Sequence, residues 1–162
     1  MAQELVPGSV AYDDNLRIAF VPEGSDAKSV AILTGGTTKD LTYSLKSFTR
    51  TISEEVIDDP RLTLKQKLQK RGKITETVEV EYVYGDPADV AYAALTPGTK
   101  GSVTVRPSTP NATAWTVAQK ADILHIECGA QRKNPPVENG VQTVTQTWFI
   151  TAPTETDAVL VA

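Results

Sequence analysis

The sequence has almost none of the residues that build metal centres and disulfides. Its 162 residues include one cysteine and one histidine. A single cysteine cannot form an intrachain disulfide or a paired-cysteine site. A single histidine excludes the histidine-rich zinc patterns. We therefore expect no metal, no cofactor and no covalent crosslink within the chain.

Long apolar runs and strong positive charge are also missing. No hydrophobic stretch approaches the roughly 18 residues of a membrane-spanning helix. The first fifteen residues, MAQELVPGSVAYDDN, have neither a basic start nor an apolar centre, so we expect no signal peptide. A net charge of -4 and a pI near 5.0 argue against a general nucleic-acid binder. We expect a soluble protein made in a reducing cytoplasm, without a membrane partner.

Threonine is what the sequence has in excess. There are twenty-one threonines beside many valines, and both residues are β-branched and favour strands. Ten glycines and ten prolines are too many for a mostly helical chain. The composition predicts a mainly β protein, a β-sandwich or partly closed barrel. The length predicts one domain over residues 1–162, with an N-terminal arm over 1–16 and a C-terminal tail over 153–162 that can be extended.

Alternating apolar and polar residues predict the strands. Short strands are expected at residues 17–21, 28–33, 101–106, 121–128 and 141–151. Within residues 40–52 the apolar face changes between Leu45 and Phe48, which predicts a β-bulge near Lys46 and Ser47.

The strongest pattern is a long β-hairpin. Residues 62–69 and 73–84 both alternate, and Lys70-Arg71-Gly72 between them is typical of a turn. The second strand, about 40 Å long at about 3.3 Å per residue, places apolar side chains on one face. Its polar face carries Thr75, Thr77, Glu79 and Glu81.

One short helix is expected at about residues 87–96. Asp86 can cap it, Pro87 suits the first helical position, and Pro97 and Gly98 end it. A narrow apolar stripe within it indicates packing against a sheet.

Candidate catalytic groups are few. His125 and Glu127 share a strand face, but no nucleophile is near, and Cys128 falls on the opposite face. We interpret Cys128 as a buried apolar residue and expect Trp115 and Trp148 in the core. The carboxylate pairs do not have the spacing of a calcium loop. The sequence therefore predicts no enzyme and no catalytic residue.

An acidic block is followed directly by a basic one. The acidic residues are Glu54, Glu55, Asp58 and Asp59, and the basic ones are Arg61, Lys65, Lys67, Lys70 and Arg71. No aromatic residues interleave to stack nucleic-acid bases. Pairing between copies of the chain suits this arrangement better, and a solvated hairpin is the alternative. We predict that these nine residues contact neighbouring subunits.

The stretch ISEEVIDDPRLTLKQKLQKRGKITETVEVEYVYGDPADVAYAAL resembles a known family, the major tail protein or tail tube protein of siphophage-type, long-tailed bacteriophages. The likeness covers roughly residues 40–152. It consists of the hairpin, a strand ending in EYVYG, the DPADVAYAAL helix and the threonine-rich strand GVQTVTQTWFIT.

The resemblance implies a structural virion protein that forms hexameric rings. The rings would stack into a hollow tube that conducts DNA during ejection without binding it specifically. Tape measure, tail-tip and tail terminator proteins are the implied partners, with assembly in the host cytoplasm. The polar residues Thr75, Thr77, Glu79 and Glu81 are then candidates for the lumen wall.

The residues also agree with such an assembly, because long edge strands need partners. A head decoration protein or an immunoglobulin-like adhesion domain is the alternative. An immunoglobulin-like domain would show about seven short strands, and this hairpin is too long for that pattern.

Overall fold

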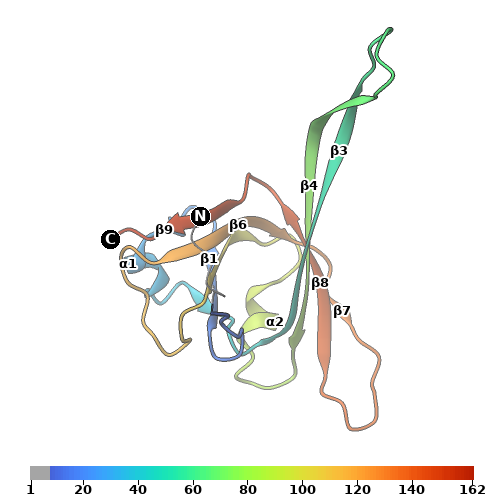
Figure 1. Ribbon diagram of the computed structural model, residues 1–162. Coiled ribbons are helices and arrows are strands. Elements are labelled where there is room, and N and C mark those ends of the chain that lie inside the picture. Colours follow the sequence, from blue (N-terminus) through green and yellow to red (C-terminus); the bar gives the residue numbers. More distant parts are fainter. Residues whose placement is uncertain (1–7) are drawn as a thin grey trace.

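The protein is mainly β, as the composition predicts. The computed structural model describes residues 8–162 and contains one antiparallel sheet with two short helices (Figure 1). The elements are β1 (Leu16–Pro22), α1 (Val30–Leu33), β2 (Lys39–Asp40), β3 (Leu45–Asp59), β4 (Leu68–Val83), α2 (Val90–Ala94), β5 (Lys100–Pro107), β6 (Lys120–Cys128), β7 (Arg132–Lys133), β8 (Thr143–Ile150) and β9 (Glu155–Val159).

The sheet is curled but not closed. Its strand order is β2-β1-β5-β6-β8-β4-β3, with β7 added to β8 and β9 added to β6. β3 and β4 continue past the other strands as a long two-stranded projection (Figure 1). β3 is thus an edge strand over its whole length within the described chain.

A large apolar core fills one face of the sheet. Alternate residues of β1, β4, β5, β6 and β8 point into it, and Ala91 and Leu95 close it from α2. The largest side chain in this core is Trp148, which is fully buried and packs edge-on against Phe48. This face gives the body its barrel-like curvature.

A smaller core covers the opposite face of β1 and β6. Ala19 and Ile123 from these strands pack with Leu33, Trp115 and Leu160. Both faces of the central strands are therefore buried, whereas β4 and β8 are covered on one face only. This difference leaves a free sheet face next to the hairpin.

Buried polar groups attach α2 to the sheet. The side-chain amide of Gln146 donates to the carbonyl oxygens of Leu95 and Gly129, both at 2.8 Å. Its oxygen accepts from Trp148 Nε1 at 3.1 Å and from the Tyr82 hydroxyl at 3.3 Å. Every polar atom of Gln146 is thus satisfied, which is the condition under which a buried amide is tolerated. Burial raises the pKa of Tyr82 to about 12.

Residues 28–33 are not a strand, contrary to the sequence prediction. They contain α1, whose Leu33 is buried in the smaller core. A short apolar run is compatible with either structure, and here packing decides.

The second helix is present but shorter than predicted. Its N-cap is Asp89, whose carboxylate accepts from the Tyr92 amide, whereas Asp86 accepts from Ala88 in the preceding turn.

The hairpin exists, but its turn lies elsewhere. The chain reverses within residues 60–67, and Lys70-Arg71-Gly72 lies inside β4. Gly72 lies at a register shift opposite Glu55, where an added Cβ would come within 2.8 Å of the Glu55 carbonyl oxygen. The glycine therefore permits a bulge rather than a turn.

The predicted bulge near Lys46 and Ser47 is confirmed by the register shift between Leu45 and Ser47.

The remaining elements agree with the sequence. The other predicted strands correspond to β1, β5, β6 and β8, and Cys128, Trp115 and Trp148 are buried. The tail forms β9 and buries Leu160 in the smaller core. Of the expected N-terminal arm, residues 1–7 lie outside the described residues, and residues 8–14 are exposed.

Arg106 organises the loop between β5 and β6. Its side chain is fully buried, and its guanidinium donates to the carbonyls of Pro110, Thr113 and Ala114 and to Gln119 Oε1 at 2.9–3.0 Å. It also lies 4.8 Å from the centre of the Trp115 ring. Each of these acceptors also has one other donor, from the Thr113 and Thr116 amides or from the Arg17 and Gln119 side chains. Arg106 therefore adds a second hydrogen bond to each acceptor and holds the loop together.

We expect Arg106→Met to lower the free energy of unfolding of the unassembled chain by about 2–4 kcal/mol, because it removes four hydrogen bonds from a charged donor, each worth about 1.5–3 kcal/mol, while the remaining donor of each acceptor compensates in part. Urea unfolding followed by tryptophan fluorescence measures the change. The exposed Arg132→Met is the matched control and should change stability by less than about 0.5 kcal/mol. Equal losses in the two variants would contradict the role of Arg106.

Candidate assembly surface

The free face of β3, β4 and β8 is lined with hydroxyl groups, and we call it the hydroxyl face. The register places Ser47 opposite Glu81, Thr49 opposite Glu79 and Thr51 opposite Thr77. On the other side, Thr145 and Thr147 of β8 lie opposite Glu81 and Glu79. The pairs Ser53 with Thr75 and Thr77 with Phe149 extend the face. Phe149 is a large exposed apolar side chain on it, and Val83, opposite Thr143, is a second.

The two glutamates of this face are held by neighbouring side chains. Arg132 Nη2 lies 3.2 Å from Glu79 Oε2, and Lys46 Nζ lies 3.3 Å from Glu81 Oε1. A hydrogen bond from Thr143 lowers the pKa of Glu81, aided by Lys46 and opposed by partial burial. Glu81 therefore stays ionised at neutral pH. The face is hydrophilic and carries ion pairs rather than a strong field of one sign.

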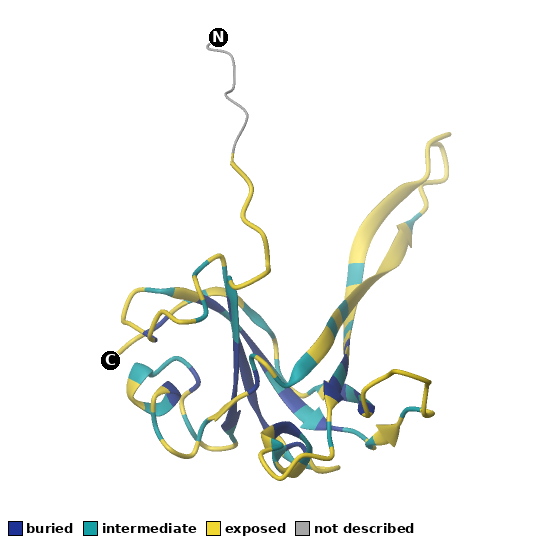
Figure 2. Cartoon of the chain, turned by 90° about the horizontal axis from the view of Figure 1, so that it is seen from below, coloured by how far each residue is buried: buried dark blue, intermediate teal, exposed yellow. Residues whose placement is uncertain are grey.

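Residues 53–75 form the projection that we call the hairpin arm. Apart from the partly covered Asp59 and Gly72, all of its residues are exposed (Figure 2). The exposed residues include six large apolar side chains, and Leu62 in the terminal loop is fully exposed. The others are Val56, Ile57, Leu64, Leu68 and Ile74. An isolated two-stranded hairpin is marginally stable in water, so this arm needs a partner surface.

The acidic and basic blocks pair with one another inside the arm. Glu54 pairs with Arg71, Asp58 with Lys67 at 2.7 Å, and Asp59 with Arg61 at 2.9 Å and Lys70 at 3.6 Å. The sequence predicted pairing between copies of the chain, whereas in the free subunit the two blocks pair within one chain. The antiparallel register brings them side by side. Within the described residues, Glu55 and Lys65 make no ion pair, so the nine predicted contact residues divide into paired and unpaired groups.

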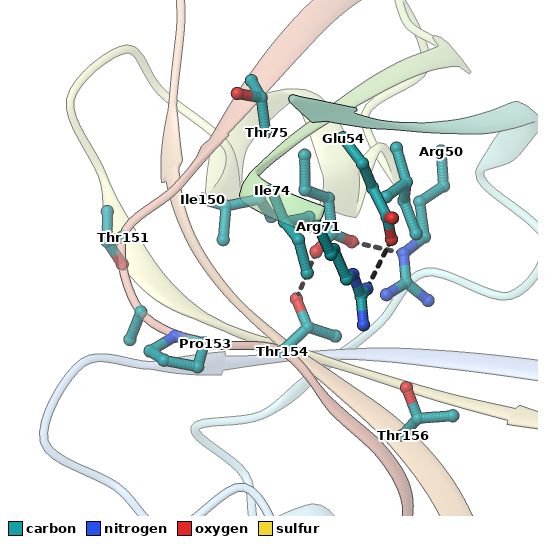
Figure 3. Close-up of a pocket in the computed structure, with 13 residues that line it drawn as sticks. Arg50, Glu54, Arg71, Ile74, Thr75, Ile150, Thr151, Pro153, Thr154 and Thr156 are labelled. Atoms are coloured by element: carbon teal, nitrogen blue, oxygen red, sulfur yellow. Dashed lines mark hydrogen bonds and ion pairs between the residues drawn. The ribbon is translucent and has the colours of Figure 1, made fainter. Parts of the chain in front are cut away.

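A groove of about 770 Å³ lies where the arm leaves the body. Figure 3 shows Arg50, Glu54, Arg71 and Ile74 of the arm side facing Ile150, Pro153 and Thr154. Glu76 anchors this region, because it pairs with Arg50 and accepts from the Thr154 hydroxyl at 2.7 Å. The groove therefore combines an apolar lining with charges that are already satisfied.

The structure also places the residues considered for catalysis. His125 Nδ1 and Ser102 Oγ are 2.8 Å apart on β6 and β5. Glu127, on the same face, lies 3.8 Å from Lys100. Cys128 points into the core, and burial raises its pKa to about 12. The thiol is thus protonated and shielded at neutral pH, which is the opposite of a reactive nucleophile.

Sequence reasoning missed the β3 and β8 parts of the hydroxyl face. The alternation of Ser47, Thr49, Thr51 and Ser53 was visible, but nothing in it showed which strand lies beside them. Arg50, which fixes the base of the arm, was also missed.

Among residues 8–162, no three histidine, cysteine or acidic side chains gather in a group able to hold a metal ion. No helix in this part of the chain is long and apolar enough to span a membrane.

Comparison with known proteins agrees with this architecture. The sequence pattern of the family described as phage tail tube protein matches residues 4–162. No curated protein sequence matches the chain. Two solved structures are similar in fold at 10% sequence identity. One is from the sixfold-symmetrised baseplate of the anti-feeding prophage, with a TM-score of 0.55, covering 93% of this chain and 96% of the other. The second is from the tail of an empty GTA particle refined with helical and C6 symmetry, with a TM-score of 0.54, covering 93% and 100%.

A β-protein with an extended arm and one free polar sheet face has the architecture of a subunit of an assembly. The match over nearly the whole chain then gives the family: the chain belongs to the phage tail tube proteins. It is a structural protein of the virion tail, as the sequence resemblance implied.

Proposed function

We propose that this chain forms hexameric rings that stack into the tail tube, the conduit for DNA ejection. The observation that carries the proposal is the hairpin arm. The arm contains the part of the 16-residue strand β4 that lies beyond the core, and it leaves six large apolar side chains exposed. Contact with neighbouring copies would cover these side chains, and stacked head-to-tail contacts produce a filament. The sixfold symmetry named for both similar structures supports six subunits per ring.

The hydroxyl face suits the lumen of such a tube. Serine and threonine hydroxyls stay hydrated, and the glutamates repel phosphates weakly because Lys46 and Arg132 pair with them. DNA could then slide along the wall without binding. Thr75, Thr77, Glu79 and Glu81 remain the proposed lumen residues, now joined by the hydroxyls of β3 and β8.

The arm is the proposed contact between subunits. Its ion pairs are exposed, so each is worth only about 0–1 kcal/mol and can exchange partners. The proposed contact residues are Glu54, Glu55, Asp58, Asp59, Arg61, Lys65, Lys67, Lys70 and Arg71. Tape measure, tail-tip and tail terminator proteins would complete the tail during assembly in the host cytoplasm.

Purified chain at high concentration should form hollow tubes with a sixfold repeat. Burial of the arm's apolar side chains in a neighbour would offset the translational and rotational entropy that the subunits lose on assembly. Negative-stain microscopy with image averaging measures this directly. Addition of tail-tip components should shorten any lag. A chain that remains monomeric under both conditions would contradict the proposed assembly.

Glu79→Cys should be protected in intact tubes from a bulky maleimide that cannot enter the lumen, while a small maleimide still labels it. Native Cys128 gives little background because it is buried and has a raised pKa. Val137→Cys, on an exposed loop away from the hydroxyl face, is the accessible control for the free subunit. Equally rapid labelling of Glu79→Cys by both reagents would rule out a lumen position.

The double reversal Lys70→Glu with Arg71→Glu should slow tube growth severalfold and leave the free subunit folded. It replaces two positive charges with two negative ones beside Glu54, Glu55 and Asp59 and thus repels an incoming acidic block. Light scattering at low salt measures growth, and circular dichroism checks folding. Lys100→Glu with Lys120→Glu changes the net charge equally but lies off the arm. If the arm variant grows at the rate of that control, the arm is not an assembly contact.

A further inference from the structure

β4 has a second free edge, on the side opposite β3. β8 pairs with β4 only from Val83 to Thr77, and the chain after Phe149 no longer follows β4. The other edge of β8, from Trp148 to Ile150, pairs with β6. Within the described chain, β4 residues 68–76 are hydrogen-bonded to a strand on the β3 side alone. A row of unpaired backbone donors and acceptors is a template for an additional strand.

The groove lies beside this edge. Its lining includes Ile74 of β4 and Ile150 and Pro153 of the departing chain (Figure 3). A strand added in line with β8 would therefore find both backbone partners and a recess with apolar side chains, Ile74, Ile150 and Pro153, for its alternate side chains. Strand addition of this type recognises a peptide by its backbone and selects it by its side chains.

The N-terminal segment, residues 8–12, has no regular secondary structure and no partner strand among the described residues. Residues 8–11 form no backbone–backbone hydrogen bond with any other described residue. Val10 and Tyr12, two positions apart, are 60% and 73% exposed. Figure 2 shows this segment leaving the body on the same side as the hairpin arm. The family match begins at residue 4, so the segment belongs to the family pattern.

The charges of the two elements are complementary. Residues 1–16 contain Glu4, Asp13 and Asp14 and no lysine or arginine. Residues 60–75, which include the free edge, contain six basic residues and no acidic one. An acidic segment approaching this strand would be attracted to it, and complementary charge favours encounter and register.

The segment cannot reach the groove of its own subunit. Asn15 N bonds to Tyr12 O and Asn111 N to Asp14 O, which fix the chain beside the β5–β6 loop. In the sheet order, β1 and β4 are four strand spacings apart, about 19 Å. Val10 lies only two residues beyond Tyr12, a reach of about 7 Å. The occupant of the groove must come from another copy.

We propose that the N-terminal segment of a neighbouring copy adds as a strand to the free edge of β4 and inserts Val10 or Tyr12 into the groove. This inference rests on the proposed tube assembly and specifies one of its contacts. In this arrangement the base of the arm receives a segment of a neighbouring copy, whereas the rest of the arm extends toward another subunit.

Co-assembly of two single variants, Val10→Cys and Ile74→Cys, tests the contact. A short bis-maleimide can then link the introduced cysteines only between copies, and it tolerates a shift in register. We expect covalent dimers on denaturing gels, at a level that random mixing of the two variants limits to about half of the chains. Val137→Cys mixed with Ile74→Cys is the control, because Val137 is at least as exposed as Val10 but lies in the loop between β7 and β8. Tubes in which the test pair links no better than the control would overturn the inference and leave the proposed function standing. Failure of the unmodified chain to form tubes would overturn both.

A charge exchange provides a second measurement that requires no crosslink. Asp13→Lys alone should slow tube growth, as should Lys70→Glu alone, and the combined variant should recover a rate close to that of the unmodified chain. The control combines Lys70→Glu with Glu138→Lys, because Glu138 lies on an exposed loop outside the N-terminal segment. Recovery that is equally good with Glu138→Lys would show that the N-terminal segment does not meet the arm.

Discussion

The continuity of β4 is the constraint on which the rest of the structure depends. One end of this strand supplies Val78, Val80 and Tyr82 to the core, where they are fully buried. The other end has no contact with the core and forms half of the arm. Because the two ends are one hydrogen-bonded strand, the direction of the arm is set by packing around Tyr82, Gln146 and Trp148. A polar network in the core thus orients a surface more than ten residues away along β4.

The sequence revealed those parts of the fold that depend on local alternation. The buried face of β4, the bulge beside Lys46 and the burial of Cys128 were all predictable, because a period of two separates inside from outside. The turn was misplaced because a bulge glycine and a turn glycine look alike in sequence. Gly72 is required by its close approach to Glu55, and that neighbour is known only once the register is known. The prediction of a strand at residues 28–33 was wrong for a related reason. Four consecutive apolar residues are compatible with a helix or a strand, and only tertiary packing selects one of them.

The candidate surface also divides into residues that a local pattern reveals and residues that only the tertiary structure brings together. Thr75, Thr77, Glu79 and Glu81 were found together because they lie on one strand. The matching hydroxyls of β3 and β8 are distant in sequence, and β8 joins β4 only after some sixty residues of intervening chain. Ion pairing inside the arm was likewise invisible, since it follows from the register of the hairpin. Patterns identify the face of a strand, whereas only tertiary structure identifies its neighbours.

The internal ion pairs bear on how the arm can work. Glu54, Asp58 and Asp59 already have partners in the free subunit, so an inter-subunit pair that replaces an internal one gains little net free energy. Stabilisation must then come from apolar side chains such as Leu62 and Ile74, at about 25 cal/mol per Å² removed from water, and from backbone edges that acquire partners. In the proposed tube the charges would instead select register and orientation among copies, since a shifted neighbour would place like charges together. The apolar contacts, repeated at every subunit, would then hold the tube.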